Sequence, residues 1–162
     1  MLSVRLEAGS AGEDAGVTGQ EWEASVPHLL WRAQNAVHRA MVESLGGLGV
    51  TVTQLGMAVH LEDYGQLSGS DLARRFRITP QSVTTALNQL EALGWVTRGP
   101  HPDHGRVILY ELTDVGRRET REGRARVAEA RAALDAVLGA EAQTFAATLH
   151  RLTVTLEDAE RG

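Results

Sequence analysis

At 162 residues, the chain has room for one compact domain with helical extensions, and not for two large domains. It contains no cysteine, which excludes disulfide bonds, iron–sulfur clusters and thiol-based redox sensing. Its net charge is −5, and no apolar run approaches the length of a membrane span, so we expect a cytoplasmic protein without a membrane segment.

The N-terminal part of the chain is a glycine-rich segment followed by a helical pattern. Residues 1–20 contain four glycines and no periodic apolar pattern, which predicts a flexible tail. From Glu21 to Leu45 apolar residues recur at helical spacing, until Gly46-Gly-Leu-Gly49 interrupts the pattern. We therefore expect one helix over 21–45.

Two further helix starts follow. Thr51 and Gln54 have the spacing of a capping box and predict a helix that ends near Gly65. Ser68 and Asp71 repeat that spacing and predict a short helix up to residue 76.

Thr79 at the N-cap and Pro80 at the first helical position predict the start of the next helix. Its expected core face consists of the apolar residues Val83, Leu87, Leu90 and Leu93. Its remaining early positions are uncharged side chains that can donate and accept hydrogen bonds at base edges: Gln81, Ser82, Thr84, Thr85 and Asn88. Gly94 is placed to end this helix.

A basic hairpin comes next. Strands are expected over 95–98 and 106–112, with a glycine- and proline-rich tip between them. Thr113 then caps a long helix to about residue 138, and a second helix is expected over 140–159. The order predicts a mainly α fold with a small β-hairpin wing, which is a winged helix-turn-helix.

This order of motifs resembles the MarR family of bacterial transcription regulators. The resemblance rests on Leu-Thr-x-x-Gly at 112–116, Thr-Pro-Gln-Ser-Val at 79–83 and Leu-Glu-x-x-Gly-Trp-Val at 90–96. Val50 to Gln54 also resembles the family's entry into its second helix, and the similarity covers roughly residues 28–160. One position departs from the pattern: the acid that usually lies two residues before Arg106 is His104 here, with Asp103 one residue further back.

The charge distribution agrees with a DNA-binding segment. The net charges of residues 1–67, 68–106 and 107–162 are −5, +2 and −2, so only the helix-turn-helix segment is positive. The alternative for each polar side chain is an ordinary solvated surface. The predicted double-stranded DNA contacts are Arg74, Arg75, Arg77, Thr79, Gln81, Ser82, Thr84, Thr85, Asn88, Arg98 and Arg106, with the polar helix residues reading bases and the arginines contacting phosphates or the minor groove.

The terminal helices are too long and thin to pack only on a small winged domain, which predicts a homodimer. Two recognition helices related by a twofold axis predict a palindromic operator with half-sites about 34–36 Å apart. We thus expect a tail over 1–20, an N-terminal dimerisation helix over 21–50, a DNA-binding domain over 51–112 and C-terminal dimerisation helices over 113–162.

The resemblance also implies a small aromatic or phenolic effector that weakens DNA binding, and no cofactor. The implied pocket residues are Trp31, His38, Met57 and His60, with plain core packing as the alternative for each. The six histidines lack the compact spacing of a structural zinc site, so no metal ligands are predicted.

No glycine-rich phosphate loop or nucleophile elbow occurs, so no enzyme is expected. The sequence therefore predicts a dimeric transcriptional repressor. Two alternatives stay open: a winged-helix protein-interaction module without DNA binding, and a zinc-responsive regulator.

Overall fold

The computed structural model describes residues 18–159. The chain divides into two compact units, Met1–Val37 and His38–Gly162. The predicted flexible tail lies outside the described residues as far as residue 17. Its last two residues, Gly19 and Gln20, are already helical, so the tail prediction is wrong at its end.

The first unit contains α1 (Gly19–Glu23) and the start of α2 (Val26–Ser44), where one continuous helix from Glu21 was expected. The continuous helix is wrong because of Pro27. Proline inside a helix lacks the N–H for the carbonyl four residues back, and its ring clashes with that carbonyl. The chain therefore stops at Ala24 and restarts at Val26, which makes Pro27 an early residue of a new helix.

In the second unit, each predicted N-cap of the winged domain is confirmed. The capping hydroxyls belong to Thr51, Ser68, Thr79 and Thr113. They start α3 (Val52–Tyr64), α4 (Gly69–Phe76), α5 (Pro80–Ala92) and α6 (Asp114–Leu138). Gly65 and Gly94 follow α3 and α5 with φ angles of 76° and 72°, the left-handed region that glycine adopts without strain.

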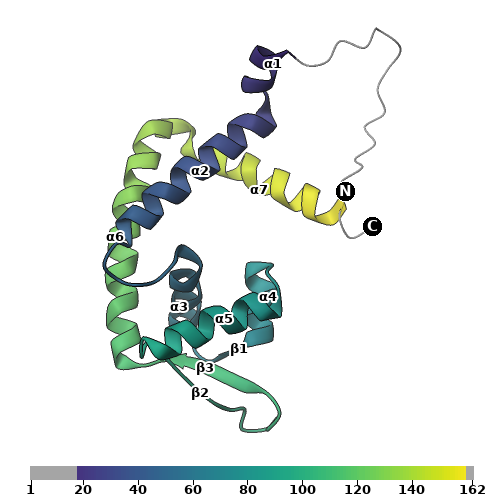
Figure 1. The fold of residues 1–162 in the computed structure, drawn as a ribbon. Coiled ribbons are helices and arrows are strands. Elements are labelled where there is room, and N and C mark those ends of the chain that lie inside the picture. The colour runs from purple at the N-terminus through teal and green to yellow at the C-terminus, as the bar shows by residue number, and fades with distance from the viewer. Residues whose placement is uncertain (1–17, 160–162) are drawn as a thin grey trace. The chain divides into compact units, whose positions relative to one another are not determined.

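A small antiparallel sheet lies beside these helices in the order β1-β3-β2. The hairpin strands are β2 (Val96–Pro100) and β3 (Ile108–Leu112), and Figure 1 shows that they extend away from the helices as the wing. β1 (Leu67–Ser68) pairs with Tyr110 and Leu109 and was not expected, because two residues carry no alternating pattern.

The core lies between α3, α4, α5 and the sheet. Its largest fully enclosed side chains are Met57, Leu72, Val83, Leu87, Leu90, Leu112 and, from the first half of α6, Thr120. The predicted core face of α5 is confirmed at three of its four positions. Leu93 is wrong: it is 44% exposed, because α5 ends at Ala92 and Leu93 already forms the C-cap, while Ala86 is buried instead.

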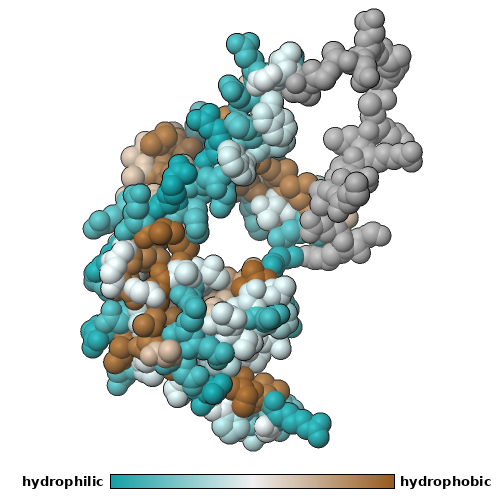
Figure 2. Space-filling model, in the orientation of Figure 1, coloured by the Kyte–Doolittle hydropathy of each residue, from teal (hydrophilic) through white to brown (hydrophobic). Residues whose placement is uncertain are grey.

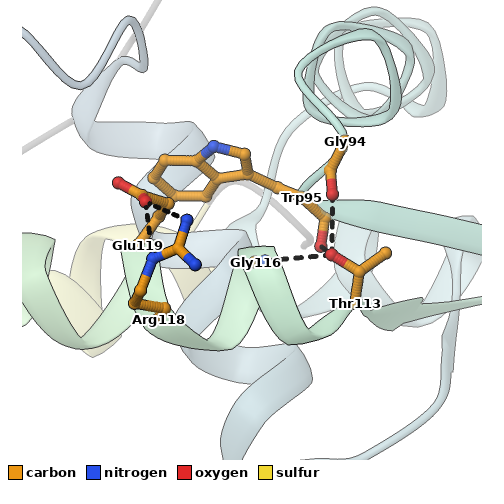
Figure 3. A network of polar contacts seen from close by, with 6 residues as sticks. All are labelled: Gly94, Trp95, Thr113, Gly116, Arg118 and Glu119. Atoms are coloured by element: carbon orange, nitrogen blue, oxygen red, sulfur yellow. Dashed lines mark hydrogen bonds and ion pairs between the residues drawn. The ribbon is translucent and has the colours of Figure 1, made fainter.

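The winged domain joins α6 through a tight polar junction, shown in Figure 3. The Thr113 hydroxyl donates to the Gly94 carbonyl at 2.6 Å and accepts the Gly116 amide at 3.0 Å, while the Thr113 amide donates to the Trp95 carbonyl. A Cβ on Gly116 would lie 2.7 Å from the Trp95 carbonyl carbon. The Leu-Thr-x-x-Gly motif is thus explained by capping and close backbone packing.

Beyond this junction the chain continues as the rest of α6, a short 3₁₀ turn (Gly139–Glu141) and α7 (Ala142–Ala159). The buried residues of α6 are Gly116, Thr120 and Gly123, all in its first half, and none of the described residues of α7 is buried. Figure 2 shows apolar surface gathered where α6 ends and α7 begins.

Candidate nucleic-acid interface

The turn between α4 and α5 fixes the start of α5. Arg77 ends α4 in the left-handed conformation, with φ 52°. Two residues later, the Thr79 hydroxyl accepts the Ser82 amide at 3.1 Å and lies 2.8 Å from the Ser82 hydroxyl. Since α5 buries Val83 and Leu87 on one side, its other side is left to solvent.

The exposed side of α5 carries every base-reading residue predicted from the sequence: Gln81, Ser82, Thr84, Thr85 and Asn88. The Thr84 and Thr85 hydroxyls donate to the carbonyls of Pro80 and Gln81, at 2.9 and 3.1 Å. Their hydrogens are therefore used within the helix, which leaves oxygen lone pairs and methyl groups for a ligand.

Gln81 and Asn88 retain their full hydrogen-bonding capacity, since neither side-chain amide has a hydrogen-bond partner within residues 18–159. They are seven residues apart, about two helical turns, so they lie on the same face of α5. Among the polar groups of this face, these two amides are the ones equipped for bidentate contact with a base edge.

A shallow hollow of about 520 Å³ lies between the start of α3 and the exposed side of α5. Gln54 lies at its base, 4% exposed. Its Oε1 accepts the Thr51 amide at 2.8 Å, and its Nε2 donates to Oε1 of Gln89 on α5. Gln54 was expected only as a cap, yet it also links α5 to α3.

Arg106 lies where three elements meet. Together with Ser70 of α4 and Thr84 of α5, it lines a second hollow of about 290 Å³ beside the wing. Arg106 is exposed and forms no ion pair within the part of the chain that the structure describes. Its guanidinium is therefore available to an anionic partner.

The other four predicted arginines contact acidic or aromatic side chains. Arg74 pairs with Asp71 at 2.5 Å, and Arg98 pairs with Glu91 at 3.2 Å. Arg75 lies over the Tyr64 ring, with its guanidinium carbon 4.0 Å from the ring centroid.

Arg77 forms a longer-range pair, 3.0 Å from Glu157 near the end of α7. These are exposed pairs in high dielectric, so each is weak and can be exchanged for a phosphate contact. Within residues 18–159, Arg106 is therefore the predicted arginine without an ion pair, whereas the other four have acidic or aromatic partners.

The Ser68 cap of α4 has an electrostatic effect. The Ser68 hydroxyl donates to the Asp71 carboxylate at 2.6 Å, and this hydrogen bond, together with the Ser68 amide and Arg74, lowers the pKa of Asp71 below its usual value. Asp71 therefore stays ionised and holds the first turn of α4 beside the second hollow.

Known proteins match this architecture. The MarR family profile matches residues 48–107. The HTH-type transcriptional repressor Rv2887 of Mycobacterium tuberculosis is 32% identical over 111 residues, which are 67% of this chain and 80% of the relative. The chain belongs to the MarR family.

A second MarR-type relative is matched over less of its length. The HTH-type transcriptional repressor MdtR of Bacillus subtilis is 36% identical over 76 residues, which are 47% of this chain and 49% of MdtR. The chain therefore spans about half the length of that relative. Both relatives are named as transcription regulators and not as enzymes.

Solved structures show the same MarR fold. A mutant of Escherichia coli MarR in complex with operator DNA superposes with a TM-score of 0.71 at 22% identity, over 83% of this chain and 96% of that one. Bordetella bronchiseptica BpsR, described as regulated in its DNA binding by 6-hydroxynicotinic acid, superposes with a TM-score of 0.75 at 21% identity, over 82% of this chain and 95% of that one.

The four ligand residues implied by the MarR resemblance lie in both units. Trp31, in the first unit, is exposed and stacks 5.9 Å from the ring of His28. In the second unit His38 is exposed on α2, while Met57 is fully enclosed in the core. His60 is half-buried, with its Nδ1 2.9 Å from the Gly56 carbonyl.

No cluster of three or more potential metal ligands occurs among residues 18–159 of this MarR-family chain. The same residues contain no helix that is both long and apolar enough to cross a membrane.

Proposed function

We propose that this MarR-family protein is a homodimeric, sequence-specific transcriptional repressor that binds an inverted-repeat operator. The observation that carries the proposal is the exposed face of α5, where the side-chain amides of Gln81 and Asn88 lie two turns apart and have no hydrogen-bond partner among residues 18–159. The unpaired Arg106 of the wing supplies charge beside that face. A repressor acts on chromosomal DNA, so the proposal also places the protein in the cytoplasm.

In this proposal α5 enters the major groove and the wing follows the neighbouring backbone or minor groove. Ser82, Thr85 and Thr84 offer acceptors and methyl groups to base edges, while Thr79 lies at the helix start, where phosphates are favoured. Arg74, Arg75, Arg77 and Arg98 exchange their present partners for phosphate oxygens on binding.

Homodimerisation is supported by the apolar side chains that the terminal helices leave in solvent. Among them are Trp22, Val26 and Leu29 in the first unit, and Leu134, Val137, Phe145, Val154 and Leu156 in the second. Single exposed apolar residues are common, but such a series along four helices, α1, α2, α6 and α7, is typical of an interface. A twofold dimer would present two copies of α5 to successive major grooves.

A small aromatic acid is the proposed effector, supported by the regulation of BpsR by 6-hydroxynicotinic acid. In the first unit Trp31 offers an indole for stacking, and in the second unit His38 and His60 offer imidazoles for stacking and hydrogen bonding. Met57 is enclosed in the core, so packing already accounts for it in this conformation. 6-Hydroxynicotinic acid is a suitable first probe, with the operator affinity of the wild type and of His60→Ala measured at rising concentrations.

Binding to duplex DNA as a function of salt tests the main proposal. A regulator that contacts several phosphates should lose affinity with a log–log slope of about −0.9 for each phosphate neutralised. Arg106→Ala should weaken binding about tenfold and reduce the slope by about one. Arg131→Ala is the matched control, because it removes the same charge from α6, where Arg131 pairs with Asp135.

The base-reading assignment needs a different measurement. Gln81→Ala and Asn88→Ala should each cost about 1–3 kcal/mol on the preferred duplex and much less on an unrelated one, because they remove a base contact. Equal losses on both duplexes would contradict base reading. A wild-type protein without measurable duplex affinity would favour the protein-interaction module instead.

A further inference from the structure

The tip of the wing is closed by three hydrogen bonds that form a ring. The amide of His101 donates to the Val107 carbonyl at 2.8 Å, and the amide of Val107 donates to the His104 carbonyl at 2.7 Å. The amide of His104 then donates to Nδ1 of the His101 side chain at 3.2 Å, which returns the ring to its first residue. Arg106 lies inside the 104–107 turn of this ring.

The His101 imidazole supplies one acceptor, Nδ1, that two backbone amides share. Besides the His104 amide, its Nδ1 also accepts the Asp103 amide at 3.1 Å. Pro102 has no N–H, so the imidazole satisfies both amides available in the segment 102–104. An Nδ1 that accepts must be unprotonated, which puts the hydrogen of the neutral ring on Nε2.

Other contacts at the tip are fewer. The His104 ring lies 4.9 Å from the His101 ring, centroid to centroid, and is otherwise exposed. Arg106 has no ion pair within residues 18–159 that could hold its segment instead. Among the described residues, the side chain of His101 is the acceptor for these two amides, so removing its Nδ1 opens the ring at this point and leaves both amides to water.

We propose that His101 is a positioning residue for DNA binding: its imidazole closes the wing tip and thereby holds Arg106 ready for the groove. The inference rests on the proposed DNA binding. Its physical benefit is that the tip is ordered before binding, so the protein does not lose that conformational freedom on the DNA.

The variants that test this are His101→Ala, His101→Asn and His104→Ala. Alanine removes the acceptor, whereas the asparagine side-chain oxygen can accept amides two or three residues further on, as in an Asx turn. His104→Ala removes the second imidazole but leaves the backbone ring intact, so it is the matched control.

The first measurement needs no DNA. Backbone ¹⁵N order parameters for residues 103–107 should be about 0.85 in the wild type and fall below about 0.6 in His101→Ala. They should stay near the wild-type values in His101→Asn and His104→Ala. Unchanged order in His101→Ala, or loss of order in His101→Asn as well, would overturn the role of the imidazole as an acceptor.

The second measurement is affinity for the duplex that the wild type selects from a random-sequence pool. His101→Ala should weaken binding about three- to tenfold, as expected for two exposed hydrogen bonds, and His101→Asn should stay within about twofold. In an Arg106→Ala background, His101→Ala should have no further effect.

The two hypotheses fail differently. If His101→Asn binds as weakly as His101→Ala while its tip stays ordered, the imidazole contacts DNA directly and positioning is overturned. If His101→Ala adds its full loss in the Arg106→Ala background, positioning of Arg106 is likewise overturned. If the wild type selects no duplex, the proposed function fails, and the positioning role fails with it, whatever the order parameters show of the tip.

Discussion

The winged domain and the C-terminal helices are built from similar residues but differ in how completely they bury them. In the winged domain, Met57, Leu72 and Leu87 are fully enclosed by neighbouring elements of the same chain. Along the second half of α6 and all of α7, no described residue is buried, and Val137 is 86% exposed.

A single copy of the chain therefore buries the core of its winged domain by itself, but leaves the second half of α6 and all of α7 largely exposed. Burial of apolar surface stabilises a domain by roughly 25 cal/mol per Å², so the winged domain carries its own stabilisation. The second half of α6 and all of α7, here called the outer helices, gain little of this stabilisation from their own chain. A second copy of the chain is the proposed source of the rest, and substitutions in the two regions should therefore have different consequences.

The largest effect is expected at the junction between the two regions. In Gly116→Ala, the new Cβ would overlap the Trp95 carbonyl group, and backbone cannot move aside as a side chain can. We expect a loss of about 3 kcal/mol in the free energy of unfolding, measured by urea denaturation. Gly99→Ala in β2 is the control, because an added Cβ there meets nothing within 4 Å. Equal stability of both variants would contradict the close packing at the junction.

A smaller effect, and on a different property, is expected in the outer helices. Val137→Glu places a charge on the surface proposed to bind a second copy. The dimer dissociation constant should rise at least about tenfold, because each copy loses an apolar contact and gains a charge to be buried. Analytical ultracentrifugation measures this directly. Val107→Glu, the same change in the wing, should leave self-association unchanged, and a stable Val137→Glu dimer would place the interface elsewhere.

The next largest effect is a gain of stability expected from substitution of Thr120, a residue of the first half of α6 that is buried in the core. The hydroxyl of Thr120 is fully buried and has no hydrogen-bond partner among the described residues. Thr120→Val keeps the shape and removes the unsatisfied hydroxyl, so the free energy of unfolding should rise by about 1 kcal/mol. Thr120→Ser keeps the hydroxyl and loses a methyl, and should lower it by about 1 kcal/mol. Destabilisation by valine would show that the hydroxyl has a partner.

The smallest effect concerns Asp71 and pH. Because hydrogen bonds from Ser68 lower its pKa in the folded state, ionised Asp71 stabilises the protein above the pKa of the unfolded chain, and this stabilisation is lost as pH falls through the folded pKa. Asp71→Asn should cost about 0.5 kcal/mol at neutral pH, a low value because the carboxylate is partly exposed, and the difference should vanish in acid.

The stability difference between Asp71→Asn and the wild type can be measured by thermal unfolding at a series of pH values from neutral to acidic. Asp114→Asn removes an acid from the first turn of α6, where it receives no capping-box hydrogen bond, and serves as the control. A difference between Asp71→Asn and wild type that persists unchanged in acid would exclude the carboxylate as its source.

The features that the sequence predicted correctly are local. The hydroxyls of Thr51, Ser68, Thr79 and Thr113 cap helices through amides three residues away, so the signal and its partner lie within one turn of chain. The outward face of α5 follows equally well, because helical periodicity places polar and apolar residues on opposite sides.

The features that were missed depend on contacts distant in sequence or on a single overlooked residue. The hydrogen bond from Gln54 to Gln89 joins positions 35 residues apart, and no local pattern indicates it. β1 exists only because Leu67 meets Tyr110 on β3. The break before α2 could have been predicted from Pro27, but the apolar residues of 21–45 keep helical spacing across it and indicated one continuous helix.

The site itself divides in the same way. The sequence predicts which residues of α5 face outward. It does not predict which arginine has no partner among the described residues, because Arg98 and Arg77 pair with acids on other elements. Their assignment as DNA contacts remains a prediction that the salt-dependence experiment tests.

Arg77 has a consequence for how this turn can vary. A residue other than glycine in the left-handed region is under backbone strain, and glycine would relieve it. Glycine would also remove the guanidinium that reaches Glu157 on α7. Glycine at this position would therefore relax the turn but remove the ion pair that links α7 to the helix-turn-helix, whereas arginine keeps that ion pair in a strained backbone conformation.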